Sequence, residues 1–277
     1  MIRQRTIRSS VLIEGVGLQT GSKTKLNIKS APANSGINFI RTDLPNKPLL
    51  NIRSLSLDSS DIKKRRTVIR SGPVEIHTTE HLLSAFFGLS IDNATIEIDG
   101  NELPGLDGSA KEYVEAVERA GVIEQDAQTK ELIVKDAVWC ASKKAVLAAF
   151  PYDGFKVSYF LSYPVRSIGE QFLSLDITAD SFKKEIAPAR TFCMKKEALL
   201  LRMLGFGRGA NSKNTLIMGS KGPLNNELRF TDEPVRHKIL DLIGDLSLIG
   251  RPLKAHIVAI KSGHGLNMEL VKKLRKE

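Results

Sequence analysis

The sequence lacks several features that would assign it to particular classes of protein. Only two cysteines occur in 277 residues, Cys140 and Cys193, and no Cys-x-x-Cys pair is present. We therefore expect no structural disulfide and a reducing, cytoplasmic environment. No apolar run approaches the ~20 residues that cross a bilayer, and residues 1–10 lack the apolar core of a secretory signal. These absences predict a cytoplasmic protein without a transmembrane segment.

Acidic residues are outnumbered, with 31 Asp and Glu against 41 Lys and Arg, which gives a net charge of +10. A basic surface favours anionic partners. The basic residues are scattered apart from runs at 63–66 and 272–276, and neither run is interleaved with aromatic residues as a single-strand nucleic-acid surface is. The charge alone leaves nucleic acid, a phosphorylated small molecule and an acidic membrane face open as partners, but both runs are better explained as solvated surface and a basic helix end, and we expect no nucleic acid. The composition, 42% hydrophobic and 26% charged, is typical of a soluble globular chain.

The first half of the chain combines strand and helix patterns. Alternation within residues 23–44, interrupted by a turn at 32–36, predicts a hairpin. Helical periodicity predicts a helix over 78–88, which leads into an alternating strand at Ala94–Ile98 and then a second helix over 109–120.

The second half repeats this order of elements. Its predicted elements are strands at 145–150 and 156–160 around a turn, a helix at 234–249, a strand at 256–260 and a helix at 266–276. The first helix of each half carries a histidine, His81 or His237, and a glycine follows at the same spacing, Gly88 or Gly244. The polar stretch 123–130 between the halves is typical of a linker.

These patterns predict an α+β fold with two similar domains that arose by internal duplication, residues 1–125 and 126–277. Each domain is expected to be a β-sheet covered on one side by helices. If the domains pack helix layer against helix layer, His81 and His237 face one another across the boundary. Clefts between domains commonly hold small-molecule sites.

The helix expected at 234–249 gathers polar side chains on one arc. At about 100° per residue, His237, Lys238, Asp241 and Asp245 share this arc, separate from an apolar face. A His and an Asp one turn apart can hold a single ion. In isolation, however, a His-x-x-x-Asp pair is more typical of an ordinary solvated helix face.

The first half supplies the residues that favour a metal site. A zinc hydrolase needs about three N or O ligands and a nearby carboxylate that takes a proton from water. His81, His237 and Asp241 offer two imidazoles and a carboxylate, and Glu80 is an adjacent base. An alternative follows from His77-x-x-Glu80-His81, which matches the inverted zinc-protease motif with His77 as a ligand. A non-catalytic nucleotide-sugar or nucleic-acid binder is the third reading, but it gives no reason for Glu80 beside His81.

Several longer motifs are shared with a known family. They are Gly15-Val16-Gly17-Leu18, Thr79-Glu80-His81-Leu82-Leu83, Leu106-Asp107-Gly108-Ser109-Ala110, Ala189-Arg190-Thr191-Phe192, residues 228–238 and Ser262-Gly263-His264-Gly265-Leu266-Asn267. Over essentially its whole length the chain resembles the LpxC-type UDP-3-O-acyl-N-acetylglucosamine deacetylases. The resemblance implies two related α+β domains with a zinc site between their helix layers, held by His81, His237 and Asp241, with Fe²⁺ as a possible substitute. It also implies hydrolysis of the N-acetyl amide of an acylated UDP-sugar, an early committed step of lipid A synthesis.

The resemblance assigns roles to five further residues. Glu80 is the expected general base, and the Thr191 hydroxyl is expected to hydrogen-bond the oxyanion. His264 is the expected cation that protonates the departing amine, Asp245 orients it, and Lys238 assists at the same centre.

The family substrate carries a diphosphate and a long acyl chain. The net charge suits the diphosphate, and the apolar stretch 194–206 is expected to line a passage for the acyl chain, with Met194 and Leu200 as candidate contacts. Phe192 is expected beside the sugar. Three departures from the family pattern are Gln19, where a histidine is usual, residues 209–213, and Pro234, where an aromatic or apolar residue is usual and a first-turn proline should be harmless. We expect a monomer.

Overall fold

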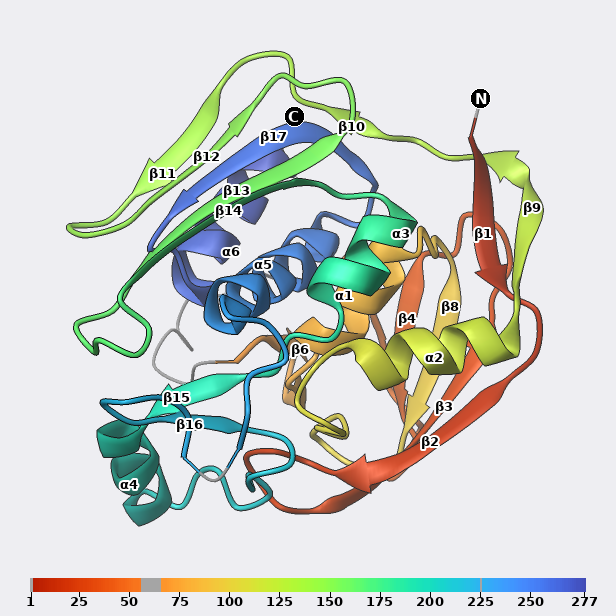
Figure 1. Ribbon diagram of the computed structural model, residues 1–277. Helices are drawn as coiled ribbons and strands as arrows, with labels where there is room; N and C mark the ends of the chain where they lie inside the picture. Colours follow the sequence, from red (N-terminus) through yellow and green to blue (C-terminus); the bar gives the residue numbers. More distant parts are fainter. Residues whose placement is uncertain (1, 56–65, 225) are drawn as a thin grey trace.

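The computed structural model describes residues 2–55, 66–224 and 226–277, so residues 63–65 of the first basic run lie outside the described part. Two β-sheets lie on opposite sides of a layer of helices, with α1 and α5 in the centre (Figure 1). The predicted mixed α+β class is therefore confirmed. Within the described ranges no helix is both long and apolar enough to cross a membrane.

The first sheet has five strands and a mixed arrangement. In spatial order they are β2 (Val11–Val16), β3 (Lys23–Ser30), β8 (Ala94–Ile98), β4 (Ile37–Arg41) and β5 (Leu49–Asn51). Strand β8 is antiparallel to β3 and parallel to β4. Its Ala94, Ile96 and Ile98 are buried and alternate with half-buried residues, as expected for a strand with one face on the core.

The second sheet repeats this arrangement. Its main strands in spatial order are β11 (Val138–Ala141), β12 (Val146–Phe150), β17 (Leu253–Ile260), β13 (Phe155–Ser162) and β14 (Glu170–Asp176). Strand β17 is antiparallel to β12 and parallel to β13, and short β10 (Leu132–Ile133) also pairs with it. The strand after the central helix thus takes the same place in both sheets.

The hairpin predicted at 23–44 is wrong in one respect. Both of its strands form, but β8 lies between them and they do not pair with each other. In the second half β17 separates β12 from β13 in the same way. The connections are long enough to pass over one intervening strand, because strands lie only about 4.8 Å apart. Alternation identifies such strands but does not specify their neighbours.

The four predicted helices are all present, with shifted ends. They are α1 (Glu80–Gly88), α2 (Lys111–Ala120), α5 (Glu233–Leu246) continued by a 3₁₀ turn (Ser247–Ile249), and α6 (His264–Leu274). Helix α1 begins two residues later than predicted because Thr78 has a φ of 58°, outside the helical region. Pro234 lies in the first turn of α5, where its missing N–H costs no hydrogen bond.

Helices α1 and α5 are in backbone contact at a glycine. A Cβ added to Gly244 of α5 would lie 2.1 Å from the carbonyl oxygen of Glu80 in α1. Only glycine permits this approach. The equally spaced Gly88 packs against the Phe182 ring, with which a Cβ would also clash. The two glycines noticed in the sequence therefore both mark close packing, and Gly244 brings the polar arc of α5 next to Glu80.

Each half also carries an insertion that sequence patterns did not reveal in full. The first has β6 (Val68–Ser71) paired with β7 (Val74–His77), and the second has β15 (Phe192–Met194), α4 (Lys195–Met203) and β16 (Leu216–Met218). Helix α4 lies within the apolar stretch predicted at 194–206.

The stretch predicted as a linker is mostly strand β9 (Val122–Gln128), which pairs with β1 (Arg3–Ile7). A short π-helical turn (Phe182–Ile186) follows the brief α3 (Ala179–Ser181).

Candidate active site

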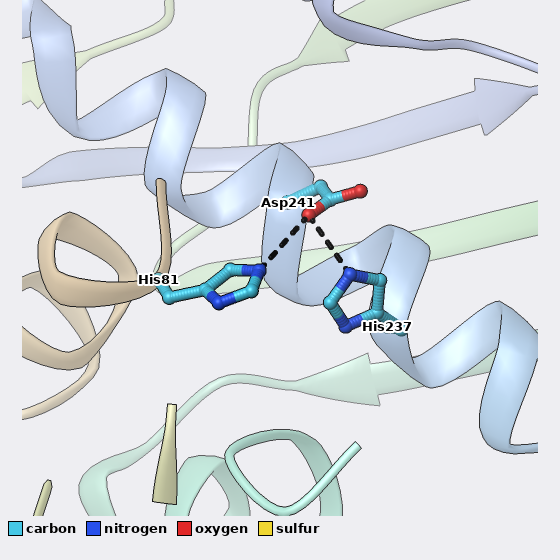
Figure 2. Close-up of side chains that lie close together, drawn as sticks. All are labelled: His81, His237 and Asp241. Carbon is cyan, nitrogen blue, oxygen red and sulfur yellow. Dashed lines mark ion pairs between the residues drawn. The ribbon is translucent and has the colours of Figure 1, made fainter. Parts of the chain in front are cut away.

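Helices α1 and α5 bring three metal-type ligands together from distant parts of the chain. His81 lies in the first turn of α1, and His237 and Asp241 lie one turn apart on α5 (Figure 2). Their ligand atoms are all within 4.8 Å of one another. The Asp241 Oδ1 atom is 3.2 Å from His237 Nε2 and 3.9 Å from His81 Nε2. All three side chains are buried.

The chemical state of the three side chains suits a cation. The Ala189 carbonyl can only accept a hydrogen bond, so His237 Nδ1, 3.0 Å away, is the donor, which leaves Nε2 as the ring atom that can bind an ion. Burial, together with the nearby His237, lowers the pKa of His81 to about 3, so this imidazole is neutral. A tetrahedral ion with bonds of ~2.1 Å holds its ligand atoms about 3.4 Å apart. The distances from Asp241 Oδ1 to the two imidazoles lie on either side of that value.

Lys238 completes the charge balance of Asp241. Its Nζ donates to Asp241 Oδ2 at 2.7 Å. Burial disfavours the charged form of each side chain, but the attraction between the two opposite charges is the larger effect. The pKa of Lys238 is raised by the carboxylate, and the pKa of Asp241 is held well below its usual range by His237 and Lys238. Asp241 is therefore an anion with Oδ1 directed toward the imidazoles.

His264 forms a second polar group on the other side of Asp241. Its Nδ1 is 2.8 Å from Asp245 Oδ2, and its Nε2 is 3.9 Å from Asp241 Oδ2. Burial lowers the pKa of His264, but the charge and hydrogen bond of Asp245 raise it more, to about 9. Asn267 Nδ2 also donates to Asp245 Oδ2, at 2.7 Å. At neutral pH His264 is thus a positioned cation.

Glu80 is a buried carboxylate beside His81. It is 4% exposed, and its Oε2 accepts a hydrogen bond of 3.1 Å from the backbone N–H of Thr67. Burial raises the pKa of Glu80 to about 8, and the nearby His264 opposes this shift. A group with a pKa close to neutral can both take and return a proton.

Thr67 joins Glu80 to the His264 group, and no pattern in the sequence pointed to it. Its hydroxyl donates to Asp245 Oδ1 and lies 3.2 Å from His264 Nδ1. Thr67 is 178 residues from Asp245 and belongs to no spacing pattern. Asn267 was also missed, although it lies one helical turn after His264 at the start of α6, where the i, i+3 spacing was a usable signal.

The three-residue cluster opens into a cavity of about 420 Å³. The cavity wall includes Thr191, Phe192, His237, Lys238, Asp241 and His264. Within the described chain the Thr191 hydroxyl forms no hydrogen bond, and the backbone is fixed because Thr191 N donates to Gly108 O at 2.8 Å. The preceding Arg190 is tied to Glu233 at the start of α5 by an ion pair of 2.9 Å. Four of the predicted catalytic and binding side chains therefore share one cavity with two of the predicted ligands.

A second, narrower pocket of about 190 Å³ adjoins this cavity and shares Thr191 and Phe192 with it. Its apolar lining comes from Leu18, Ala198, Leu201, Leu204, Phe206 and Ile217. Two predicted contacts do not line it. Met194 is packed into the core, and Leu200 is 53% exposed on the outer side of α4. The helical period explains the difference, because Ala198 and Leu201 face the pocket while Leu200 points away.

Two of the three departures from the family pattern lie at this second pocket. Gln19 lines it and accepts a hydrogen bond of 3.3 Å from Gly207 N through its side-chain oxygen. Ala210 and Asn211, from the stretch 209–213, lie in the same wall. These two departures therefore alter the narrow pocket rather than the three-residue cluster, whereas the third, Pro234, lies in the first turn of α5.

Comparisons with known proteins identify the family of this chain. The model of the UDP-3-O-acyl N-acetylglycosamine deacetylase family, LpxC, matches residues 4–276. A UDP-3-O-acyl-N-acetylglucosamine deacetylase of Chlamydia pneumoniae is 41% identical, with 98% of this chain and 96% of the relative aligned. One from Trichormus variabilis is 37% identical, with 99% and 98% aligned. The chain belongs to the LpxC family.

A third relative is longer than this chain. The "Bifunctional enzyme LpxC/FabZ" of Chlorobaculum tepidum is 37% identical over the whole of this chain, which spans 65% of that relative. Similarity to it therefore concerns only the part of the longer enzyme that aligns with this chain.

LpxC-family membership and the position of His77 together argue against the inverted protease motif. His77 ends β7, where its Nδ1 accepts from Arg66 and its Nε2 is 3.2 Å from Glu75. His77 is not part of the three-residue cluster found among the described residues. The His77-x-x-Glu80-His81 match is a coincidence of spacing, since β7 ends before α1 begins.

Proposed function

We propose that this protein hydrolyses the N-acetyl amide of UDP-3-O-acyl-N-acetylglucosamine. The products are acetate and the free 2-amine of the UDP-3-O-acyl-glucosamine, an early committed step of lipid A synthesis. One observation carries the proposal in a chain of this family. His81, His237 and Asp241 converge at a cavity that also presents His264, with Glu80 buried beside His81.

The three-residue cluster fits a resident divalent cation. Two neutral imidazoles and one carboxylate are the donor set of catalytic zinc sites, and they leave positions free for water and substrate. The proposed ion is Zn²⁺, with Fe²⁺ as the alternative because the same donors accept both. When bound, such an ion supplies Lewis acidity that polarises an amide carbonyl and makes water more acidic.

Glu80 is the proposed general base. Its Oε2 is occupied by Thr67 N, and Oε1 accepts no hydrogen bond from any described residue, so Oε1 is the atom available to take a proton from the attacking water. A cation held at the three-residue cluster favours the ionised carboxylate and brings its pKa below the metal-free value. Glu80 then acts as a base at neutral pH.

The remaining groups manage charge on the acetyl carbon and the amine. The Thr191 hydroxyl, which forms no hydrogen bond with any described residue, is proposed to donate to the oxyanion, which gains charge in the transition state. His264 is proposed to give its Nε2 proton to the departing nitrogen while Asp245 holds Nδ1. Lys238 keeps Asp241 ionised and adds positive charge beside the reacting carbonyl.

The two adjoining pockets suit the two parts of the substrate. The polar 420 Å³ cavity would hold the sugar, with Phe192 at the junction beside it. The narrow pocket would hold the 3-O-acyl chain against Leu201, Leu204 and Phe206, in place of the Met194 and Leu200 contacts expected from the sequence. The net charge of +10 favours an anionic UDP-sugar.

We also propose that residues 1–125 and 126–277 are two related domains that arose by duplication. The support is the common strand order and sense of the two sheets, together with equivalent histidines and glycines on α1 and α5. On this view the cation lies between the helix layers of the two domains. We expect a monomer in the cytoplasm, and light scattering on the purified protein tests the monomer.

The proposed function is tested with purified protein and UDP-3-O-acyl-N-acetylglucosamine. We expect release of equimolar acetate and free amine, abolished by a chelator and restored by Zn²⁺ or Fe²⁺. Metal-loaded, folded protein that releases no acetate would overturn the deacetylase proposal. Cleavage of an unmodified peptide instead would favour the protease alternative, and tight UDP-sugar binding without turnover would favour a non-catalytic binder.

The activity should follow a bell-shaped pH profile whose basic limb reports His264. The His264 cation is lost as pH rises through its pKa, which Asp245 raises to about 9, so the rate should fall in that range. Asp245→Asn removes the charge that favours the imidazolium, and should move the basic limb to lower pH and reduce the maximal rate. His264→Ala should keep its metal, lose ~10²-fold or more in rate, and lose this limb.

A matched control is Asp176→Asn, which removes an exposed carboxylate near a different histidine, His256, on the second sheet. Its profile should equal that of the parent protein. Metal content is measured at each pH so that loss of the ion is not mistaken for titration. If His264→Ala keeps an unchanged basic limb, Lys238 becomes the proton donor and the role given to His264 is wrong.

A further inference from the structure

Helix α4 and the residue after it expose four large apolar side chains. Leu199 is 66% exposed, Leu200 53%, Met203 71% and Leu204 62%. Because residues that are adjacent or three to four positions apart lie on the same side of a helix, these four side chains form one surface, which we call the α4 face. Single exposed apolar residues are ordinary, but a contiguous group marks an interaction surface. In Figure 1, α4 projects from the periphery with β15 and β16, away from both sheets.

The border of the α4 face is positively charged. Lys195, Lys196, Arg202 and Arg208 are exposed, and none of their side chains forms a hydrogen bond or ion pair with a residue that the structure describes. The only acid of the helix is Glu197, whose carboxylate accepts from Met194 N at 3.1 Å. The α4 face thus combines exposed apolar side chains with unpaired cations and has no exposed acid.

We propose that the α4 face docks on the surface of a membrane that contains anionic lipids. Helices that lie in the plane of the bilayer interface have this composition, with leucine and methionine on one side and lysine and arginine around it. The apolar side chains enter the boundary between headgroups and acyl chains, while the cations meet lipid phosphates. The charge complementarity selects an anionic bilayer as the occupant.

Docking would place the narrow pocket next to the bilayer. That pocket is lined by Ala198 and Leu201 on the inner side of α4 and also by Leu204 of the α4 face, and it shares Thr191 and Phe192 with the catalytic cavity. An acyl chain that leaves the lipid phase beside α4 therefore has a short apolar route to the site. This last step rests on the proposed function, whereas membrane docking itself does not.

Binding is measured by flotation of the metal-loaded protein with vesicles of phosphatidylethanolamine and phosphatidylglycerol, and with vesicles of phosphatidylcholine alone. We expect partition onto the anionic vesicles only, weakened by salt because exposed charges are screened. The double variant Leu199→Gln, Met203→Gln should bind at least ~10-fold more weakly because it loses two apolar contacts. The double variant Lys195→Gln, Lys196→Gln should lose about fivefold for each lysine.

The matched control exchanges equally exposed apolar residues elsewhere, as Leu12→Gln with Phe172→Gln, which are 59% and 64% exposed. Its vesicle binding should be unchanged. A parent protein that does not float with anionic vesicles would overturn the proposal, as would an equal loss in the control. If Leu199→Gln, Met203→Gln instead converts a dimer into a monomer, the α4 face belongs to a second copy of this chain and the membrane proposal is wrong.

A kinetic measurement separates this proposal from the proposed function. With a short-chain substrate in solution, Leu199→Gln, Met203→Gln should match the parent in kcat and KM. With substrate presented in anionic vesicles, its apparent KM should rise in step with the loss of binding. Absence of deacetylation in every protein would reject the proposed function and leave vesicle binding as an independent result.

Discussion

Replacing Glu80 with glutamine should leave the metal content unchanged and remove most of the turnover. A general base in position contributes ~10²–10⁴-fold to the rate, and glutamine keeps the shape of the side chain but cannot accept the proton. Glu80 is 4% exposed beside His81, and its Oε2 bond to Thr67 N can also form with a side-chain amide oxygen. The fold should therefore be retained while kcat falls and KM changes little.

The removal of one carboxylate from this region requires its own control. Glu75→Gln is the control, because Glu75 lies five residues earlier on β7 and forms ion pairs with Arg70 and His77. Single-turnover rates and metal content are measured for both variants. If Glu80→Gln loses less than about tenfold, Glu80 is not the base. If it loses its metal, Glu80 supports the three-residue cluster instead.

Much of this site could be predicted because its chemistry follows local spacing. His237, Asp241 and Asp245 come from one helix, where positions four residues apart must lie on one face whatever the fold around them. Glu80 and His81 are neighbours in the chain. Their meeting with α5 was inferred from the repeated order of elements, since two copies of one layer architecture must pack their helix sides together to bury them.

The parts that could not be predicted depend on long-range packing. No local pattern specifies that β8 lies between β3 and β4, because alternation is the same whichever strand is the neighbour. Thr67 contacts Asp245 because backbone hydrogen bonds hold it beside Thr78 and Glu80 at the start of α1. The choice between Leu200 and Leu201 as pocket residues depends on the rotation of α4, which apolar composition alone does not fix.

Substituting any one of the three proposed ligands should abolish metal binding and activity together. His81→Ala, His237→Ala and Asp241→Ala each leave two donors, and the loss should be nearly complete because the three atoms hold one ion jointly. The histidine variants give the clearer result. Asp241→Ala also strips Lys238 of its buried partner, and breaking such a pair costs about 3–5 kcal/mol in stability. Metal per chain is measured by mass spectrometry after anaerobic purification, which also distinguishes zinc from iron.

His77→Ala is the matched control for this experiment. His77 is a buried histidine four residues before His81, and both of its ring nitrogens are engaged by Arg66 and Glu75. It should lose stability but keep one metal ion per chain, since His77 is not part of the three-residue cluster found among the described residues. Loss of metal in His77→Ala with retention in His237→Ala would restore the inverted protease motif. Full metal occupancy in any one of the three ligand variants would show that the replaced residue is not a ligand. Only three protein side chains hold the ion, so the loss of a true ligand must lower its occupancy.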